Sequence, residues 1–305
     1  MAINRVEIKD FLVFKGEFAA DFCSGVNVLI GGNGTGKTTL LKSLYKIVKF
    51  ILFHRRLPNS PGKIIINNGE NSFRYDNRTI FINVTNDLRA IYIPEKDILE
   101  HAKGLLTFIE QKQTGFGQVY KDVLIAAQDV PTRKQSKAQK NIGQKIVSIT
   151  GGDVHWDKGE GSFYTLKTDG SRIPFANEAS GYKKMGFLGL LVSSGQLEPG
   201  TILFWDEPEN SLNPELVPIL VDILLELSRN NVQIFIGTHS EILASYFAVN
   251  RQDEDNVMFI SLYKDGEHIK ANTSSRFDLL EPNNLTAEPV KLYEKELEKG
   301  LGGNG

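Results

Sequence analysis

The segment GGNGTGKTT, residues 31–39, leaves few folds open to this chain. It satisfies the pattern G-x-x-x-x-G-K-[ST], whose fixed positions are Gly31, Gly36, Lys37 and Thr38. The apolar run 26–30 precedes the segment and apolar residues at helical spacing follow it, so the loop joins a predicted strand to a predicted helix. Glycines let backbone N–H groups curl around phosphate oxygens, and a helix start adds partial positive charge. The sequence therefore predicts a phosphate-binding loop.

The types of residue in this loop suit a nucleoside triphosphate with Mg²⁺. The Lys37 ammonium is expected to reach the β- and γ-phosphates, and the Thr38 hydroxyl to bind Mg²⁺. The residues expected to cradle the nucleotide are Asn33, Gly34, Thr35, Gly36, Lys37, Thr38 and Thr39. The alternative is a glycine-rich turn that matches by accident, and the strand–loop–helix context argues against it. We predict ATP and Mg²⁺ as ligands.

An acidic pair ends the apolar run 201–205. A carboxylate at the tip of a buried strand beside a phosphate loop can hold Mg²⁺, which is the role predicted for Asp206. The adjacent Glu207 can act as general base on the attacking water. The alternative is a solvated strand end without chemistry. Glu209 and Asn210 are expected to be structural.

Three segments together, GGNGTGKTT, WDEPENSLNP and FIGTHS, resemble those of an ABC-type ATPase head. The resemblance implies that residues 211–214 form the D-loop at a dimer seam. It also implies that His239, directly after the predicted strand 232–237, is the switch histidine near the γ-phosphate. A capping or packing role is the alternative for this histidine.

ABC-type heads complete their site with a signature segment from the second subunit, and residues 178–184, EASGYKK, occupy the corresponding place here. Ser180 is expected to cap a helix that points at the γ-phosphate in trans, and Gly181 to allow close backbone approach. The segment departs from the family pattern at Tyr182 and Lys183. An ordinary N-capped helix is the alternative. The resemblance implies a two-fold homodimer that forms on ATP binding.

In this family a glutamine normally couples the Mg²⁺ site to the helical lobe. The segment Tyr92-Ile-Pro-Glu95 lies where similar proteins carry it, so Glu95 is a candidate metal ligand in its place, with Gln111 as the weaker alternative.

The degenerate signature and the segment 25–34, GVNVLIGGNG, resemble the soluble branch of the ABC-type ATPases. This branch contains the SMC, RecF and OLD-like ATPases and stand-alone AAA ATPases. The expected fold is α/β: a P-loop NTPase with a mainly parallel core sheet, an N-terminal antiparallel β lobe and an inserted helical subdomain. The whole chain, 1–305, is expected to be one domain. Its parts are the β lobe with the P-loop at 1–96, the helical and hairpin insertion at 97–184, the lobe with the acidic strand end and the switch histidine at 185–271, and a tail at 272–305.

Local patterns predict the elements of this fold. Short strands are expected within the first thirty residues and at 63–66, 72–75, 79–84 and 90–93, a hairpin meander at 153–175, and a hairpin turn at Lys264. Two uniformly apolar runs around a helix indicate a parallel sheet that is covered on both faces. A helix is predicted at 288–299, with an apolar stripe at Val290, Tyr293 and Leu297 expected to pack on its own subunit; docking a partner is the alternative.

Composition restricts the environment and the partners. The net charge of −2 argues against a surface coated for nucleic acid, Cys23 is the single cysteine, and no window approaches a transmembrane helix. A cytoplasmic protein without direct membrane insertion is expected. The stretch 130–152 contains Arg133, Lys134, Lys137, Lys140 and Lys145 and no acid, which predicts either a solvated face or a nucleic-acid contact.

These features favour an ATP-hydrolysing dimeric switch that acts on a protein effector. Similar stand-alone heads pair with an effector in antiviral systems, which the resemblance extends to this chain as an expectation. The alternatives are a binding module clamped by ATP with little turnover, which the degenerate signature motivates, and the ATP-binding subunit of an ABC transporter.

Overall fold

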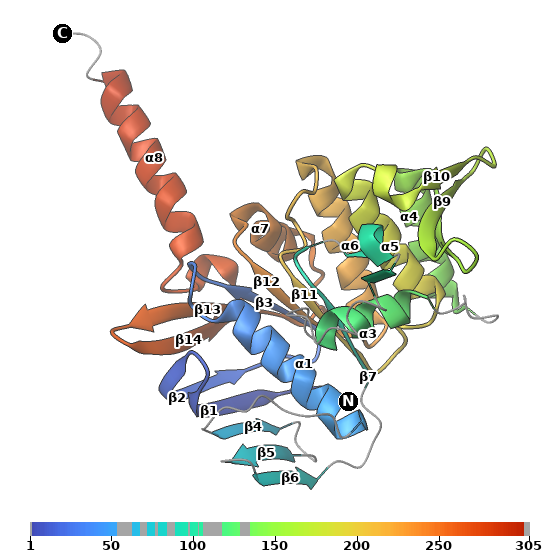
Figure 1. Cartoon of the computed structure of the whole chain (residues 1–305). Helices are drawn as coiled ribbons and strands as arrows, with labels where there is room; N and C mark the ends of the chain where they lie inside the picture. The colour runs from blue at the N-terminus through green and yellow to red at the C-terminus, as the bar shows by residue number, and fades with distance from the viewer. Residues whose placement is uncertain are drawn as a thin grey trace.

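A layered α/β molecule emerges from the computed structural model (Figure 1). The structure describes residues 2–53, 63–67, 72–76, 79–83, 89–96, 98–102, 104–105, 118–128 and 135–301.

The central sheet has the strand order β14-β13-β3-β12-β11-β7. Its strands are β3 (Val26–Ile30), β7 (Arg89–Ile93), β11 (Thr201–Asp206), β12 (Gln233–Thr238), β13 (Val257–Asp265) and β14 (His268–Ser274). All pairings are parallel except that of β14 with β13. Every residue of β3, β11 and β12 is buried, as uniformly apolar strands inside a parallel sheet should be. The predicted mainly parallel core sheet is confirmed.

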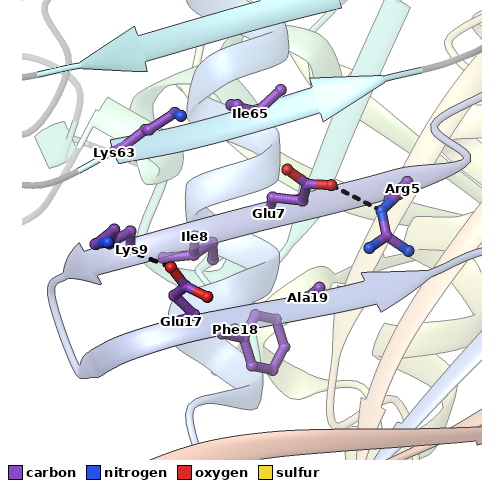
Figure 2. Close-up of a pocket in the computed structure, with 9 residues that line it drawn as sticks. All are labelled: Arg5, Glu7, Ile8, Lys9, Glu17, Phe18, Ala19, Lys63 and Ile65. Atoms are coloured by element: carbon purple, nitrogen blue, oxygen red, sulfur yellow. Dashed lines mark hydrogen bonds and ion pairs between the residues drawn. The ribbon is translucent and has the colours of Figure 1, made fainter.

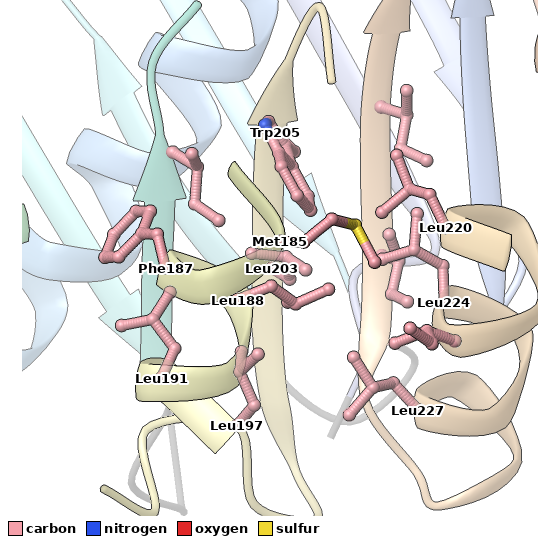
Figure 3. Close-up of a cluster of buried hydrophobic side chains, with 14 of the residues drawn as sticks. Met185, Phe187, Leu188, Leu191, Leu197, Leu203, Trp205, Leu220, Leu224 and Leu227 are labelled. Carbon is pink, nitrogen blue, oxygen red and sulfur yellow. The ribbon is translucent and has the colours of Figure 1, made fainter. Parts of the chain in front are cut away.

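Side chains from opposite faces of this sheet enter two hydrophobic cores. Val28 and Ile30 belong to one core and Leu29 to the other, because successive side chains of a strand point to opposite faces. The helices that cover the sheet are α1 (Lys37–Phe53), α5 (Ser180–Ser193), α6 (Val217–Arg229) and α7 (Glu241–Asn250). Figure 3 shows Met185 of α5 between Trp205 of β11 and Leu220 of α6.

A second, antiparallel sheet forms most of the N-terminal lobe, in the order β2-β1-β4-β5-β6. Its strands are β1 (Arg5–Phe11), β2 (Phe14–Asp21), β4 (Lys63–Asn67), β5 (Ser72–Asp76) and β6 (Thr79–Asn83). Val6 and Ile8 alternate with exposed or half-buried charges, which is the pattern of a sheet with one solvated face. The predicted antiparallel β lobe is confirmed.

Between β7 and β11 the chain builds a helical lobe with its own small sheet. Its elements are η1 (Leu99–His101), α3 (Gln118–Ala127), α4 (Lys137–Thr150), β8 (Gly152–Asp157), β9 (Ser162–Lys167), β10 (Arg172–Pro174) and η2 (Phe175–Asn177). Ser136 and Gln139 close a capping box that starts α4. The three strands form the antiparallel meander predicted for 153–175.

The C-terminal part differs from the sequence-based expectation. η3 (Pro214–Leu216) precedes α6, and η4 (Phe277–Leu279) precedes α8 (Asn284–Leu301), which is a longer helix than predicted. Figure 1 shows α8 projecting away from the body. Tyr293 and Leu297 are 61% and 45% exposed, so the expectation that these two residues of the stripe pack on their own subunit is wrong. The Val290 side chain lies outside the described part of the structure. Its docking to a partner stays a prediction.

Candidate functional site

Three parallel strands bring the predicted motifs to one edge of the central sheet. β3 ends at Ile30 before the phosphate loop, β11 ends at Asp206, and β12 ends at Thr238 before His239. β12 lies between the other two and pairs with both. The carboxyl ends of parallel strands share one edge, where ligands of open α/β sheets bind. The structure therefore gathers residues that are far apart in the sequence.

The Asp206 carboxylate is held between two hydroxyl groups. Thr38 at the start of α1 donates to Oδ1 at 3.1 Å, and Tyr92 of β7 donates to Oδ2 at 3.0 Å. Asp206 is only 4% exposed. Burial and the neighbouring Asp206 charge both raise the pKa of Tyr92, so its hydroxyl stays a donor. A hydroxyl and a carboxylate are hard oxygen ligands, which suit Mg²⁺ completed by substrate phosphates.

The Lys37 side chain is folded back over its own loop. Its ammonium donates to the carbonyl oxygens of Gly31 at 2.7 Å and Gly32 at 3.3 Å, and contacts His239 Nε2 at 2.9 Å. Burial lowers the pKa of Lys37 to about 8, against a partial opposing effect of nearby acids. Because these partners are neutral carbonyl oxygens and an imidazole ring, the Lys37 ammonium can exchange them for negatively charged phosphate oxygens.

Glu207 is held in a strained backbone conformation. Its φ is 49°, in the left-handed region that few non-glycine residues adopt, and its N–H donates to the Gly237 carbonyl at 2.8 Å. Burial, followed by the charges of Glu95 and Glu209, raises the pKa of its carboxyl group. A raised pKa moves a carboxylate toward the range of an effective general base.

His239 contacts both the lysine and the acid. Its Nε2 lies 2.9 Å from Lys37 Nζ and 3.4 Å from Glu207 Oε1. Burial, then the Lys37 charge, lowers the pKa of the imidazole, which favours the neutral ring that accepts from the lysine. Glu209 Oε1 accepts from the Thr238 hydroxyl and from the His239 N–H, so it orients this turn.

Gly237 allows the close packing of these parts. A Cβ atom there would lie 3.0 Å from Leu41 Cδ1 and 3.1 Å from Asp206 Oδ1. A side chain at this position would crowd the Asp206 carboxylate and the Leu41 side chain of α1.

A family model described as "AAA domain, putative AbiEii toxin, Type IV TA system" matches residues 68–245. The chain belongs to this AAA-domain family. The matched range contains Asp206, Glu207 and His239 and begins after the phosphate loop, so the assignment of that loop depends on its own sequence and geometry.

Other similarities agree with the family. The DNA replication and repair protein RecF of Oenococcus oeni is 42% identical over 55 residues, which cover 18% of this chain and 14% of RecF. The SMC head bound to the C-winged helix domain of ScpA has a TM-score of 0.57 and 14% identity, and the match covers 91% of this chain and 99% of that chain. The SMC head domain from Thermotoga maritima has a TM-score of 0.53 and 14% identity, with 90% and 99% covered. The family is therefore the AAA-domain family, and the fold is similar to that of SMC heads.

The predicted signature segment, residues 178–184, differs from the expectation in one respect. Ala179 is the N-cap of α5 and makes no side-chain capping bond, and Ser180 is the first helical residue. The prediction that Ser180 caps the helix is therefore wrong, because the backbone turns into the helix one residue earlier. Ser180 is exposed at the helix start, and a Cβ on Gly181 would lie 3.7 Å from the Asn213 N–H nitrogen in the predicted D-loop.

Two lysines of this segment face inward. Lys183 is 8% exposed, and its ammonium pairs with Glu100 Oε2 at 2.5 Å, which lowers the pKa of that carboxyl group. Lys184 donates to the carbonyl oxygens of Glu207 at 3.0 Å and Pro208 at 3.3 Å. Helix α5 is thus tied to the acidic strand end of its own chain.

The candidate metal ligand Glu95 lies close to the site without a contact to Asp206. Its Oε1 accepts from Asn210 at 2.9 Å, and its charge acts on Glu207. Its metal role stays a prediction. The weaker candidate Gln111 lies outside the described residues.

The basic strip is only partly described. Arg133 and Lys134 lie outside the described residues, whereas Lys137, Lys140 and Lys145 lie on α4. Lys145 pairs with Glu226 at 2.5 Å, so part of its charge is neutralised. Among the described helices, none is long and apolar enough to cross a bilayer.

Sequence reasoning missed Tyr92 and Lys184. Tyr92 belongs to an apolar strand and looks like a core residue, and only its pairing across the sheet brings it to Asp206. The structure also has a depression of about 400 Å³ on the outer face of β1, β2 and β4, lined by charged residues such as Glu7, Lys9 and Glu17 (Figure 2). None of the predicted site residues lines it.

Proposed function

We propose that this protein binds ATP with Mg²⁺ between two copies of the chain and hydrolyses it as a molecular switch. The observation that carries the proposal is the convergence of Lys37, Thr38, Asp206, Glu207 and His239 at one sheet edge, with direct contacts among them.

Each of these residues has a role that its contacts support. Lys37 leaves the loop carbonyls to bind β- and γ-phosphate oxygens, while the remaining loop residues from Asn33 to Thr39 supply backbone N–H groups. Thr38 and Asp206 hold Mg²⁺, which when bound neutralises the developing charge on the phosphates. The loop, the hydroxyl and the carboxylate therefore orient the triphosphate for attack.

Glu207 then acts on the water. Its carboxylate accepts a proton from the water whose oxygen attacks the γ-phosphorus, and the bond to the ADP oxygen breaks. The His239 ring lies within reach of the same acid. Once Lys37 has moved to the phosphates, the neutral ring carries its proton on Nε2 and donates to the γ-phosphate. The start of α5, with exposed Ser180 and half-buried Gly181, serves the nucleotide of the second copy, which makes the dimer two-fold and ATP-dependent.

The test compares two substitutions with a matched control. Glu207→Gln is expected to keep ATP binding, lose turnover and accumulate an ATP-bound dimer, and Lys37→Ala to lose binding. Glu160→Gln, in an exposed turn of the helical lobe, removes a carboxylate away from the site and is expected to behave as wild type. Binding is measured by calorimetry, turnover by phosphate release and mass by light scattering. Unchanged turnover in Glu207→Gln would remove the base assignment.

A second candidate is an ATP-clamped binding module with little turnover. The burial of Lys183 against Glu100, where ABC-type heads carry a Gln or Glu, favours it, because this side chain is committed to its own protomer. Phosphate release by the wild-type protein, with and without DNA, separates the two. Steady release above the Glu207→Gln background excludes the clamp.

We further propose that the switch acts on a protein effector in the cytoplasm, in an antiviral or toxin–antitoxin setting. The family description names a toxin of a Type IV system, and two solved SMC heads of similar fold are bound to domains of ScpA. Native mass measurement of complexes purified with ATP tests this. An integral membrane protein as stoichiometric partner would support the transporter alternative instead.

A further inference from the structure

The hairpin formed by β13 and β14 lies beside the phosphate loop. β13 pairs in parallel with β3, the strand that leads into the loop, with Ser261 opposite Ile30. Both strands therefore run toward the same edge of the sheet. The residues that follow Ser261, up to the turn at Gly266, continue past the sheet edge on the side of the nucleotide loop.

The loop is in close contact with this hairpin. A Cβ atom on Gly31 would lie 2.3 Å from the Leu262 carbonyl oxygen, and one on Gly36 would lie 3.3 Å from Ile269 Cδ1. The first distance is to backbone, which cannot move aside without breaking the sheet. The hairpin thus forms one wall of the loop, and its position relative to the loop is fixed by backbone packing.

Lys264 lies near the end of β13, beside the phosphate loop. Its Nζ would lie 3.5 Å from a Cβ on Gly34, at the apex of the loop, and its side chain is otherwise exposed. The other charges of the turn are paired: Asp265 with Lys270, and Glu267 with Lys15 at 2.9 Å. Across the described part of the chain, no carboxylate lies within ion-pair distance of Lys264.

Two ammonium groups therefore flank the loop. Lys37 lies on the side of His239, and Lys264 lies beside Gly34. An ammonium that has no acid nearby, next to backbone N–H groups arranged for an anion, attracts a polyphosphate through both charge and hydrogen bonds.

We propose that Lys264 is a second phosphate-binding lysine of this site and contacts the polyphosphate chain of the bound nucleotide. The proposal rests on the proposed function, because it assigns a residue to the same ATP site. It assigns to the β13–β14 hairpin a direct part in binding ATP, beyond its structural part as a wall of the loop.

The experiment is a calorimetric titration of the full chain with Mg-ATP and with ADP, at about 50 mM and about 300 mM NaCl. Lys264→Ala is expected to weaken ATP binding by about three- to tenfold at low salt, as for an exposed charge pair, and by less at high salt. Lys264→Arg is expected to recover most of the affinity because it keeps the charge. Lys9→Ala is the matched control, since it removes an exposed lysine that pairs with Glu17 on the outer sheet face (Figure 2).

The outcomes separate this proposal from the proposed function. If Lys264→Ala binds ATP within about twofold of wild type at low salt while Lys37→Ala does not bind, the Lys264 proposal is overturned and the proposed function stands. A loss that salt does not reduce and arginine does not restore indicates a purely structural role and also overturns it. If the wild-type chain itself binds no ATP, both proposals fail. Equal losses for ATP and ADP support contact with the α- or β-phosphate, and a loss for ATP alone supports contact with the γ-phosphate.

Discussion

Replacing Tyr92 by Phe removes one hydroxyl group from the candidate metal site and nothing else. The ring is fully buried, and it packs against Tyr45 with 5.6 Å between centroids, a contact that Phe retains. The lost interaction is the 3.0 Å hydrogen bond to Asp206 Oδ2. Since Asp206 is 4% exposed, water cannot fully replace the donor. A hydrogen bond to a charged group contributes about 1.5–3 kcal/mol, so we expect a loss of about 2 kcal/mol in the free energy of unfolding.

Urea unfolding followed by circular dichroism measures this loss. The free energy of unfolding falls by about 2–3 kcal/mol per M urea for a chain of this size, so the urea midpoint should fall by about 0.7–1 M. Tyr246→Phe is the control, because Tyr246 is only half-buried and packs on the core edge; it should change the free energy by less than about 0.5 kcal/mol.

A second measurement connects the hydrogen bond to the site. Tyr92 fixes the carboxylate that Thr38 also contacts, so Tyr92→Phe should raise the Mg²⁺ concentration needed for half-maximal ATP binding. If Tyr92→Phe unfolds within about 0.5 kcal/mol of wild type and its Mg²⁺ dependence is unchanged, the hydroxyl does not orient Asp206 and the reasoning is refuted.

The perturbed pKa values support three further predictions. The raised pKa of Glu207 means that the folded state disfavours its carboxylate form. The free energy of unfolding therefore falls as the pH rises from 4.5, the ordinary pKa of a glutamate, through the raised pKa. Glu207→Gln removes this carboxylate, so it should raise the Tm at neutral pH and leave it unchanged near pH 4. As the pH is lowered, wild-type turnover should begin to fall at a pH above 4.5, because Glu207 with a raised pKa is protonated there and cannot act as a base. A turnover profile that stays flat down to pH 4.5 would contradict the base role. The pKa of Lys37, lowered to about 8, means that its ammonium is lost above that pH. ATP affinity should therefore decline above pH 8 in titrations of wild type, and Lys264→Ala, which keeps Lys37, should show the same decline.

The sequence by itself determined the parts of the site that lie directly after buried strands. The glycine loop, Asp206, Glu207 and His239 each follow an apolar strand. Parallel strands present their carboxyl ends at one edge, so local patterns were sufficient to predict that these residues meet. The antiparallel β lobe and the hairpin meander were predictable for a similar reason, because alternation and turn residues act over short distances.

Only the tertiary structure decided which neighbours act on these residues. Tyr92 reaches Asp206 across the sheet, and Lys264 reaches Gly34 from a hairpin far along the chain. Neither contact has a signal in the local sequence. The helix start at Ser180 was misread by one residue, since the turn that precedes a helix depends on backbone angles that several residues can adopt. The terminal stripe at Tyr293 was misread because periodicity shows that a helix has an apolar face and does not show what covers it.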